Sequence, residues 1–206
     1  MIAAGSLEYA HARMQARLSR RPSEGTWAAI SEARALVPIY DAARGTSLER
    51  LLAALPPQPD LPDVDRAART AWTRTVDEAA SWMPAEWGPA LAWCDSAAQA
   101  APNPTVLPTL AHPEWRRRWP AGEDDPALEE LARLFADHLA RFRIALPHQA
   151  QAMRLAFGDR LLALFRRRPV QAAAAFAWLA IAALDLERLR GEIERRIAFP
   201  EARIAA

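Results

Sequence analysis

The segment from Val170 to Ile197 places the strongest constraint on how this chain can fold. Its first half, up to Leu184, is almost entirely apolar and rich in alanine, whereas its second half, from Asp185 onward, alternates leucines with Glu and Arg. No proline interrupts it, and its one glycine, Gly191, comes late. The pattern predicts one continuous helix, buried on all sides in its first half and amphipathic in its second. Such a helix needs other helices packed around it.

Helical periodicity in the rest of the chain predicts those neighbours, and we find no convincing strand pattern. Several predicted helices begin at a residue suited to N-capping, namely Ser6, Ser47, Asp63 and Asp125, the last followed by a proline at the first helical position. The predicted helices are Leu7–Arg20, a segment bearing Trp27, Ile30 and Leu36, a short helix from Leu48 to Leu55, Val64–Met83, Glu86–Ala100, an amphipathic helix from Leu128 to Phe142, a helix from Met153 to Phe165, and the long C-terminal helix.

Two proline-rich stretches divide this helical pattern. Pro56–Pro62 predicts a stiff linker, and five prolines between residues 101 and 124 forbid a long helix there. We therefore expect an all-α bundle of about seven or eight helices. The expected division is an N-terminal helical subdomain at 1–100, a proline-rich connection at 101–124 and a C-terminal subdomain at 125–206. A single continuous domain is the alternative.

Composition excludes several classes of chemistry. The chain has 206 residues and a net charge of +1, so no global field selects nucleic acid or an anionic membrane. All 26 basic residues are arginine, which removes lysine Schiff-base chemistry and a P-loop lysine. The single cysteine, Cys94, excludes an intramolecular disulfide and a cysteine-based zinc site.

We also expect a cytoplasmic protein, peripheral to the inner membrane if it belongs to a complex. The N-terminal stretch Met1–Gly5 is too short and too uncharged for a secretory signal. The apolar run at 170–184 is shorter than the roughly 20 residues of a membrane span. A membrane contact, on this interpretation, would be made only through partner proteins.

Catalytic and metal-binding motifs are absent from the sequence. None of the four histidines forms a His-x-x-x-His pattern, and no nucleophile elbow, dinucleotide fingerprint or Walker motif occurs. His138 lies beside an apolar stripe where a haem or metal ligand could sit, but a boundary histidine with one polar partner is the interpretation we favour. We interpret Cys94 as a packed small hydrophobe, and Glu123, Asp124 and Asp125 as a solvated loop with a helix cap. We expect no catalytic residue, no cofactor and no metal.

The most suggestive cluster combines arginine with tryptophan. Arginines flanked by tryptophans can hold a phosphate backbone while the rings stack on bases, which makes a nucleic-acid-associated helical protein one alternative. Because the global charge is near zero, a basic patch that meets an acidic protein partner is the use we favour. Arg195 and Arg196 could extend the same surface. The candidate partner-binding residues are Trp115, Arg116, Arg117, Arg118, Trp119, Arg166, Arg167 and Arg168. A further alternative is a helical bundle that binds a small molecule or cofactor near His138 and His148.

Three segments together resemble the C subunits of rotary A/V-type ATPases, a family whose eukaryotic members are known as d subunits. Glu8–Arg17 resembles the opening helix of that family, and Leu61–Ala67 resembles the proline-rich entry to an early helix of bacterial members. Ala177–Trp178, followed by Leu184–Arg190, resembles the closing helix. The chain is shorter than family members, and Ala180–Ala183 stand where the family carries a charged pair.

The resemblance implies an all-helical, funnel-shaped protein without enzymatic activity of its own. Members of the family act as a socket that couples the central stalk to the membrane ring of proteolipid subunits. On this basis we expect a non-enzymatic adaptor whose partners are the stalk and the proteolipid ring of such an ATPase. Its residues would then serve packing and contact with those partners.

Overall fold

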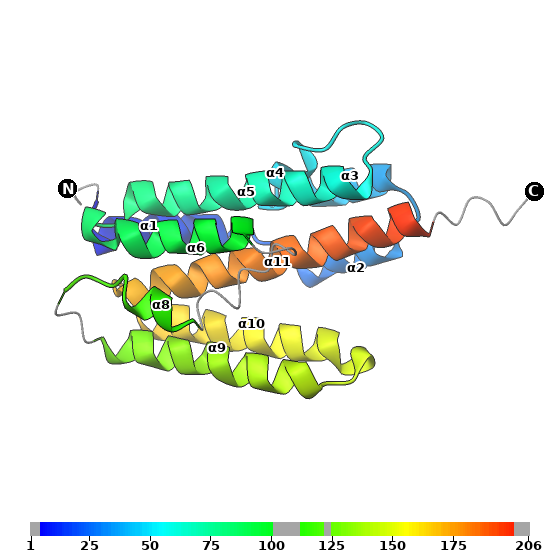
Figure 1. The fold of residues 1–206 in the computed structure, drawn as a ribbon. Coiled ribbons are helices and arrows are strands. Elements are labelled where there is room, and N and C mark those ends of the chain that lie inside the picture. The colour runs from blue at the N-terminus through cyan, green and yellow to red at the C-terminus, as the bar shows by residue number, and fades with distance from the viewer. Residues whose placement is uncertain (1–4, 101–111, 122–124, 200–206) are drawn as a thin grey trace, which may run out of the picture. The chain divides into compact units, whose positions relative to one another are not determined.

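The computed structural model describes residues 5–100, 112–121 and 125–199, and within them every regular element is helical (Figure 1). The all-α prediction is therefore confirmed for this part of the chain, which contains eight helices of seven or more residues and a 27-residue C-terminal helix. The helices are α1 (Leu7–Leu18), α2 (Glu24–Glu32), α3 (Leu36–Ala43), α4 (Glu49–Leu52), α5 (Leu61–Trp82), α6 (Gly88–Ala100), α8 (Pro113–Arg116), α9 (Pro126–Ile144), α10 (Ala150–Arg167) and α11 (Ala172–Ala198), with short 3-10 turns η1 (Ala85–Trp87) and η2 (Pro147–Gln149).

The chain forms two compact units, each built from segments that are distant in sequence. The first unit contains the residues up to Gln15 together with Thr73–Leu184, and the second contains Ala16–Trp72 together with the residues from Asp185 onward. This division differs from the consecutive one at 1–100 and 125–206 that we expected. Of the proline-rich connection at 101–124, residues 101–111 and 122–124 lie outside the described residues. Both long helices, α5 and α11, contribute residues to each unit.

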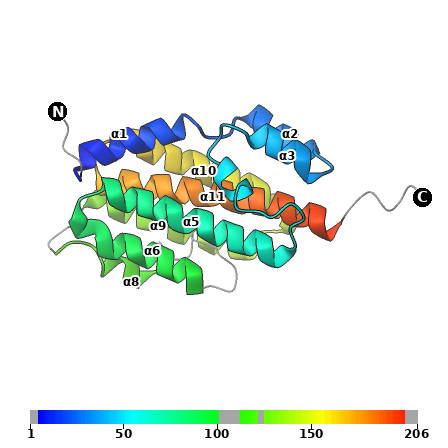
Figure 2. The same ribbon diagram turned by 90° about the horizontal axis from the view of Figure 1, so that it is seen from above.

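The apolar half of α11 forms the centre of the first unit. From Ala172 to Leu184 every residue of α11 except Ala182 is buried. The ring of Phe176 makes T-shaped contacts with the rings of Trp115 and Trp87, with centroids at 4.9 and 5.8 Å. Helices α9 and α10 form a hairpin in the same unit and pack against each other (Figures 1 and 2). The predicted all-round burial of this half of the helix is confirmed.

The second unit has its own apolar core. Helices α2 and α3 pack together, and the amphipathic half of α11 adds Leu189 and Ile193, both fully buried. Gly191 and Arg195 lie on the exposed side of the same half-helix. The predicted change from a buried to an amphipathic helix at Asp185 therefore coincides with the boundary between the units. The remaining core members are Trp27, Ile30, Ile39, Ala43, Leu48, Leu51, Leu52, Val64, Ala68 and Ala71.

Two of the predicted helix starts are confirmed by their caps. The Asp125 carboxylate accepts a hydrogen bond from the Ala127 amide at 2.8 Å, with Pro126 as the first helical residue of α9. The Ser6 hydroxyl accepts one from the Tyr9 amide at 3.2 Å at the start of α1. In both cases a short polar side chain satisfies an amide that the first helical turn leaves unpaired.

The predicted caps at Asp63 and Ser47 are wrong. Helix α5 begins before Asp63. The Asp60 carboxylate accepts a hydrogen bond from the Asp63 amide at 2.8 Å, and the Asp63 carboxylate accepts one from the Asp60 amide at 3.2 Å. This reciprocal arrangement is a capping box, and Pro62 is tolerated inside it because the first helical amides need no intrahelical acceptor. Ser47 precedes only a four-residue helix, α4, that has no side-chain cap.

Candidate partner-binding surface

In α8 and the residues that follow it, the tryptophans of the predicted cluster are buried or half-buried, whereas its arginines are exposed. Trp115 is only 1% exposed, and its ring lies 4.9 Å from Phe176 and 5.2 Å from Trp119, edge-on to both. Such contacts are those of a core residue, and Trp119 is half-buried beside it. A partner-binding role for Trp115 stays a prediction that would require this ring to be uncovered.

The three arginines between these tryptophans are exposed, and each has a neighbour within the chain. Arg116 forms an ion pair with Glu129 of α9 at 2.5 Å, and Arg117 pairs with Glu114. The Arg118 guanidinium lies over the ring of Trp93, 5.5 Å from its centroid. Because the Arg116 and Arg117 side chains keep 62% and 73% of their surface exposed, these ion pairs are weak and open to exchange.

The second arginine run ends α10 and meets the same helix. Arg167 and Arg168 contact the two carboxylate oxygens of Glu130 at 2.8 and 3.3 Å. Burial favours the neutral acid, but hydrogen bonds and charge from both arginines outweigh it and hold the pKa of Glu130 below its ordinary value. Arg166 is exposed and has no acidic partner among the described residues.

Helix α9 thus brings together two arginine runs that are far apart in the sequence. Glu129 and Glu130 occupy adjacent positions near its N-terminus and bind one run each. We call the surface made by the six arginines the arginine face; its members are Arg116, Arg117, Arg118, Arg166, Arg167 and Arg168. Within the described parts of the chain, the acidic partners of these six guanidinium groups are Glu114, Glu129 and Glu130, which are three carboxylates for six cations.

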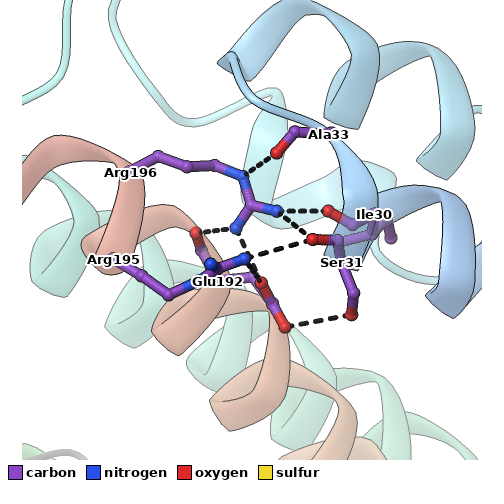
Figure 3. A network of polar contacts seen from close by, with 6 residues as sticks. All are labelled: Ile30, Ser31, Ala33, Glu192, Arg195 and Arg196. Atoms are coloured by element: carbon purple, nitrogen blue, oxygen red, sulfur yellow. Dashed lines mark hydrogen bonds and ion pairs between the residues drawn. The ribbon is translucent and has the colours of Figure 1, made fainter. Parts of the chain in front are cut away.

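Arg196 is not part of the arginine face, contrary to the expectation that it could extend such a surface. Its side chain is 6% exposed, and it hydrogen-bonds the main chain where α2 ends (Figure 3). It donates to the carbonyl oxygens of Ala33 at 2.8 Å, Ser31 at 3.1 Å and Ile30, and pairs with Glu192 at 2.6 Å. The side chain therefore caps a helix that is distant in the sequence, at a separation of 163 residues from Ala33.

Glu192 holds this network together from the other side. It accepts hydrogen bonds from Arg196 at 2.6 Å, Arg195 at 3.1 Å and the Ser31 hydroxyl at 3.1 Å (Figure 3). Burial alone would raise the pKa of Glu192. The hydrogen bonds from these three donors lower it by more than burial raises it, so the net shift of the pKa is downward. No local sequence signal distinguishes Arg196 from the other arginines, which is why sequence reasoning missed this role.

A second buried ion pair lies where α11 enters the second unit. Arg21 donates to both carboxylate oxygens of Asp185, at 2.8 and 3.1 Å, in a fork that matches the carboxylate. Asp185 is 6% exposed, and desolvation raises its pKa despite the attraction of Arg21. Arg188, one turn further, lies 4.1 Å over the ring of Trp27. These contacts anchor the helix within its unit.

His138 and Cys94, the histidine and the cysteine considered as candidates for chemistry, are both buried and packed against neighbouring residues. His138 is 6% exposed and stacks on Phe157 with centroids 4.1 Å apart and planes 7° from parallel. Burial, reinforced by Arg154 and Arg160, lowers its pKa. Cys94 is buried, its thiol donates to the Ala90 carbonyl at 3.3 Å, and desolvation raises its pKa. The described residues contain no group of three or more His, Cys, Asp or Glu placed to hold a metal.

His148, by contrast, is exposed in η2, so the structure does not bury it in a pocket with His138. Glu123 and Asp124 lie outside the described residues, and Asp125 serves as the cap of α9. Of the helices that the structure describes, none combines the length and apolar character needed to cross a membrane.

Comparisons with known proteins add no relative. No family model, no curated protein and no solved structure matches the chain.

Proposed function

We propose that this chain is a non-enzymatic helical adaptor, a shortened relative of the C subunit of rotary A/V-type ATPases, which links a central stalk to a membrane proteolipid ring. The proposal rests on the resemblance of three segments, which fall in α1, α5 and α11. The all-helical fold and the buried spine provided by α11 are compatible with it. In such a role the protein would transmit force through a packed interior and meet its partners through its surface.

The observation that supports partner binding most directly is the arginine face. Its guanidinium groups are partly exposed, and their ion pairs to Glu129 and Glu130 hold them in place without burying them. An acidic surface on a partner could replace or join these glutamates at little cost, because exposed pairs contribute only about 0–1 kcal/mol each. Electrostatic complementarity of this kind sets specificity and association rate.

Affinity capture from the native cell tests the proposal. A tagged chain should retain stalk and proteolipid-ring components of a rotary ATPase, and Arg166→Glu should weaken that retention. Arg166 is the cleanest probe because it has no acidic partner in the described chain, so reversing its charge breaks no internal pair. Arg20→Glu, at an exposed site in the second unit, is the matched control for net charge.

Two results would count against the proposal. Capture of other proteins without any rotary ATPase component would remove the family assignment. Equal retention by Arg166→Glu and Arg20→Glu would remove the arginine face as the contact surface.

The nucleic-acid alternative makes a different prediction. Release of counterions from phosphates makes such binding fall steeply with salt, and base stacking would require a free Trp115 ring. Trp115 is 1% exposed, so the observation that supports this alternative is weaker than the one that supports protein contact. A gel shift at low salt that disappears in Arg116→Glu would favour it.

A further inference from the structure

The turn between α9 and α10, together with the start of α10, carries three exposed aliphatic side chains. Ile144 is 84% exposed, Leu146 56% and Leu155 48%. Single exposed hydrophobics are ordinary, but these three lie close together in the sequence around one turn. We call the segment from Arg141 to Leu155 the hairpin tip (Figure 1).

The hairpin tip is also free of acidic residues. No Asp or Glu occurs from His138 to Gly158, whereas Arg141, Arg143 and Arg154 all lie inside this stretch. Arg141 and Arg143 are exposed and form no ion pair within the described residues. In this respect they differ from the arginine face, where glutamates of α9 offset part of the charge.

Arg154 is held close to the apolar side of the tip. Its guanidinium lies 4.8 Å from the centroid of the Phe142 ring, a distance at which cation and ring attract each other. The tip therefore presents cationic groups beside uncovered aliphatic ones. At a membrane–water interface arginine can contact the headgroups while a neighbouring apolar side chain enters the acyl boundary.

We propose that the hairpin tip docks on an anionic lipid surface, with its arginines on the headgroups and Ile144 and Leu146 entering the acyl boundary. This inference goes beyond the proposed function, in which membrane contact is made only through partner proteins. It is independent of the arginine face, because none of the tip residues belongs to that surface.

The small number of exposed aliphatic side chains at the tip favours a lipid surface over a protein. A stable protein interface needs roughly 800 Å² and 20–30 residues on each side, far more than three aliphatic side chains around a turn supply. A lipid surface has no such threshold, because each cation and each inserted side chain adds its contribution separately. The tip also offers no continuous apolar stripe along one helix, which docking into a protein groove would require.

The expected binding is weak, reversible and sensitive to salt. Each arginine near an anionic surface contributes a factor of roughly five to the partition coefficient, and screening reduces this contribution as the ionic strength rises. The tip would therefore orient the protein at a membrane and would not hold it there alone.

Co-sedimentation of the full chain with vesicles tests the proposal. The probes are phosphatidylcholine vesicles with and without phosphatidylglycerol, at low and at physiological salt. The wild-type chain should bind the anionic vesicles at low salt and pure phosphatidylcholine much less. Arg141→Gln/Arg143→Gln should lower the partition coefficient roughly 30-fold, and Ile144→Asp/Leu146→Asp should lower it roughly tenfold or more. Both double variants alter only exposed side chains, so helical content and thermal stability should stay unchanged.

Matched controls carry the same changes elsewhere. Arg20→Gln/Arg74→Gln removes two exposed arginines that lie outside both the tip and the arginine face, and Val37→Asp/Phe199→Asp alters apolar residues that are 69% and 75% exposed. These variants should bind like the wild type after allowance for their net charge.

Three results would overturn the proposal. The first is no binding to anionic vesicles at low salt, and the second is equal loss of binding in tip and control variants. The third is a protein, captured from the native cell by the wild type and lost by the tip variants, in the absence of vesicle binding; this would assign the tip to a protein partner. Failure of the rotary-ATPase capture affects none of these readouts.

Discussion

Arg196 provides the most demanding test of how this fold is held together. Replacing it with alanine removes the donors to three carbonyl groups at the end of α2 and leaves Glu192 without its closest cation (Figure 3). A helix leaves its final carbonyl acceptors without intrahelical partners, so these groups depend on donors from elsewhere. Glu192 would keep Arg195 and the Ser31 hydroxyl.

The magnitude follows from burial. The Arg196 side chain is 6% exposed and that of Glu192 19%, so the pair is largely removed from water. Removing one partner of a buried ion pair costs about 3–5 kcal/mol, because the other charge and its acceptors stay desolvated. For a protein of this size each kcal/mol lowers the melting temperature by about 2–4 °C, which gives an expected fall of roughly 6–20 °C for Arg196→Ala.

Denaturant unfolding monitored by circular dichroism measures this loss, with two matched variants. Arg195→Ala removes the neighbouring arginine, whose side chain is 55% exposed, and should cost no more than about 1 kcal/mol. Arg196→Lys keeps the charge but not the planar fork, so it should lie between the wild type and Arg196→Ala.

The pH dependence provides a second readout. Because the pKa of Glu192 is lowered on folding, its contribution is present above its ordinary pKa of 4.5 and is lost as the pH falls through the lower folded value. Arg196→Ala should flatten this part of the stability curve. Equal destabilisation by Arg195→Ala and Arg196→Ala, or an unchanged acid limb, would refute the reasoning.

Three further predictions concern single side chains. Phe176→Ala should destabilise the protein by about 3–5 kcal/mol in urea unfolding, whereas Phe199→Ala, at a 75% exposed site, should be nearly neutral; similar losses would contradict the packing described. Val170 has a φ of +62°, where a β-branched side chain is strained, so Val170→Asn should raise stability by about 1 kcal/mol; a lower melting temperature would argue against it. Because burial lowers the pKa of His138 and of His11, stability should fall as the pH drops below about 6.5. His138→Gln should reduce that fall and leave the part due to His11, and the double variant His11→Gln/His138→Gln should reduce it further.

The sequence predicted best where a signal is local and uninterrupted. The C-terminal helix was recognisable because alanine and leucine run without a proline, and its change at Asp185 follows directly from composition. The start of α9 was recognisable because Asp125 and Pro126 specify a cap together. At α5 two aspartates three residues apart, Asp60 and Asp63, both fit a cap, and the reciprocal hydrogen bonds between them decided the outcome.

Contacts between distant segments could not be predicted in the same way. Arg196 and Ile30 are 166 residues apart, and nothing near either residue announces the other. The tryptophans at 115 and 119 suggested an exposed cluster, but a helix as short as α8 has too little periodicity to reveal which face is buried. The arginines of the same segment were predicted to be exposed, and they are; their ion pairs with α9 depended on tertiary structure.

The interleaved path of the chain has a consequence for its synthesis. Neither unit is complete until α11 has been made, because the first needs Phe176 and the second needs Leu189 and Ile193. Synthesis proceeds at about 5–20 residues per second, so the apolar faces of the earlier helices would stay uncovered for tens of seconds before α11 is made. Folding should therefore wait until α11 has left the ribosome, and a polypeptide that stops before α11 would be a substrate for chaperones or proteases.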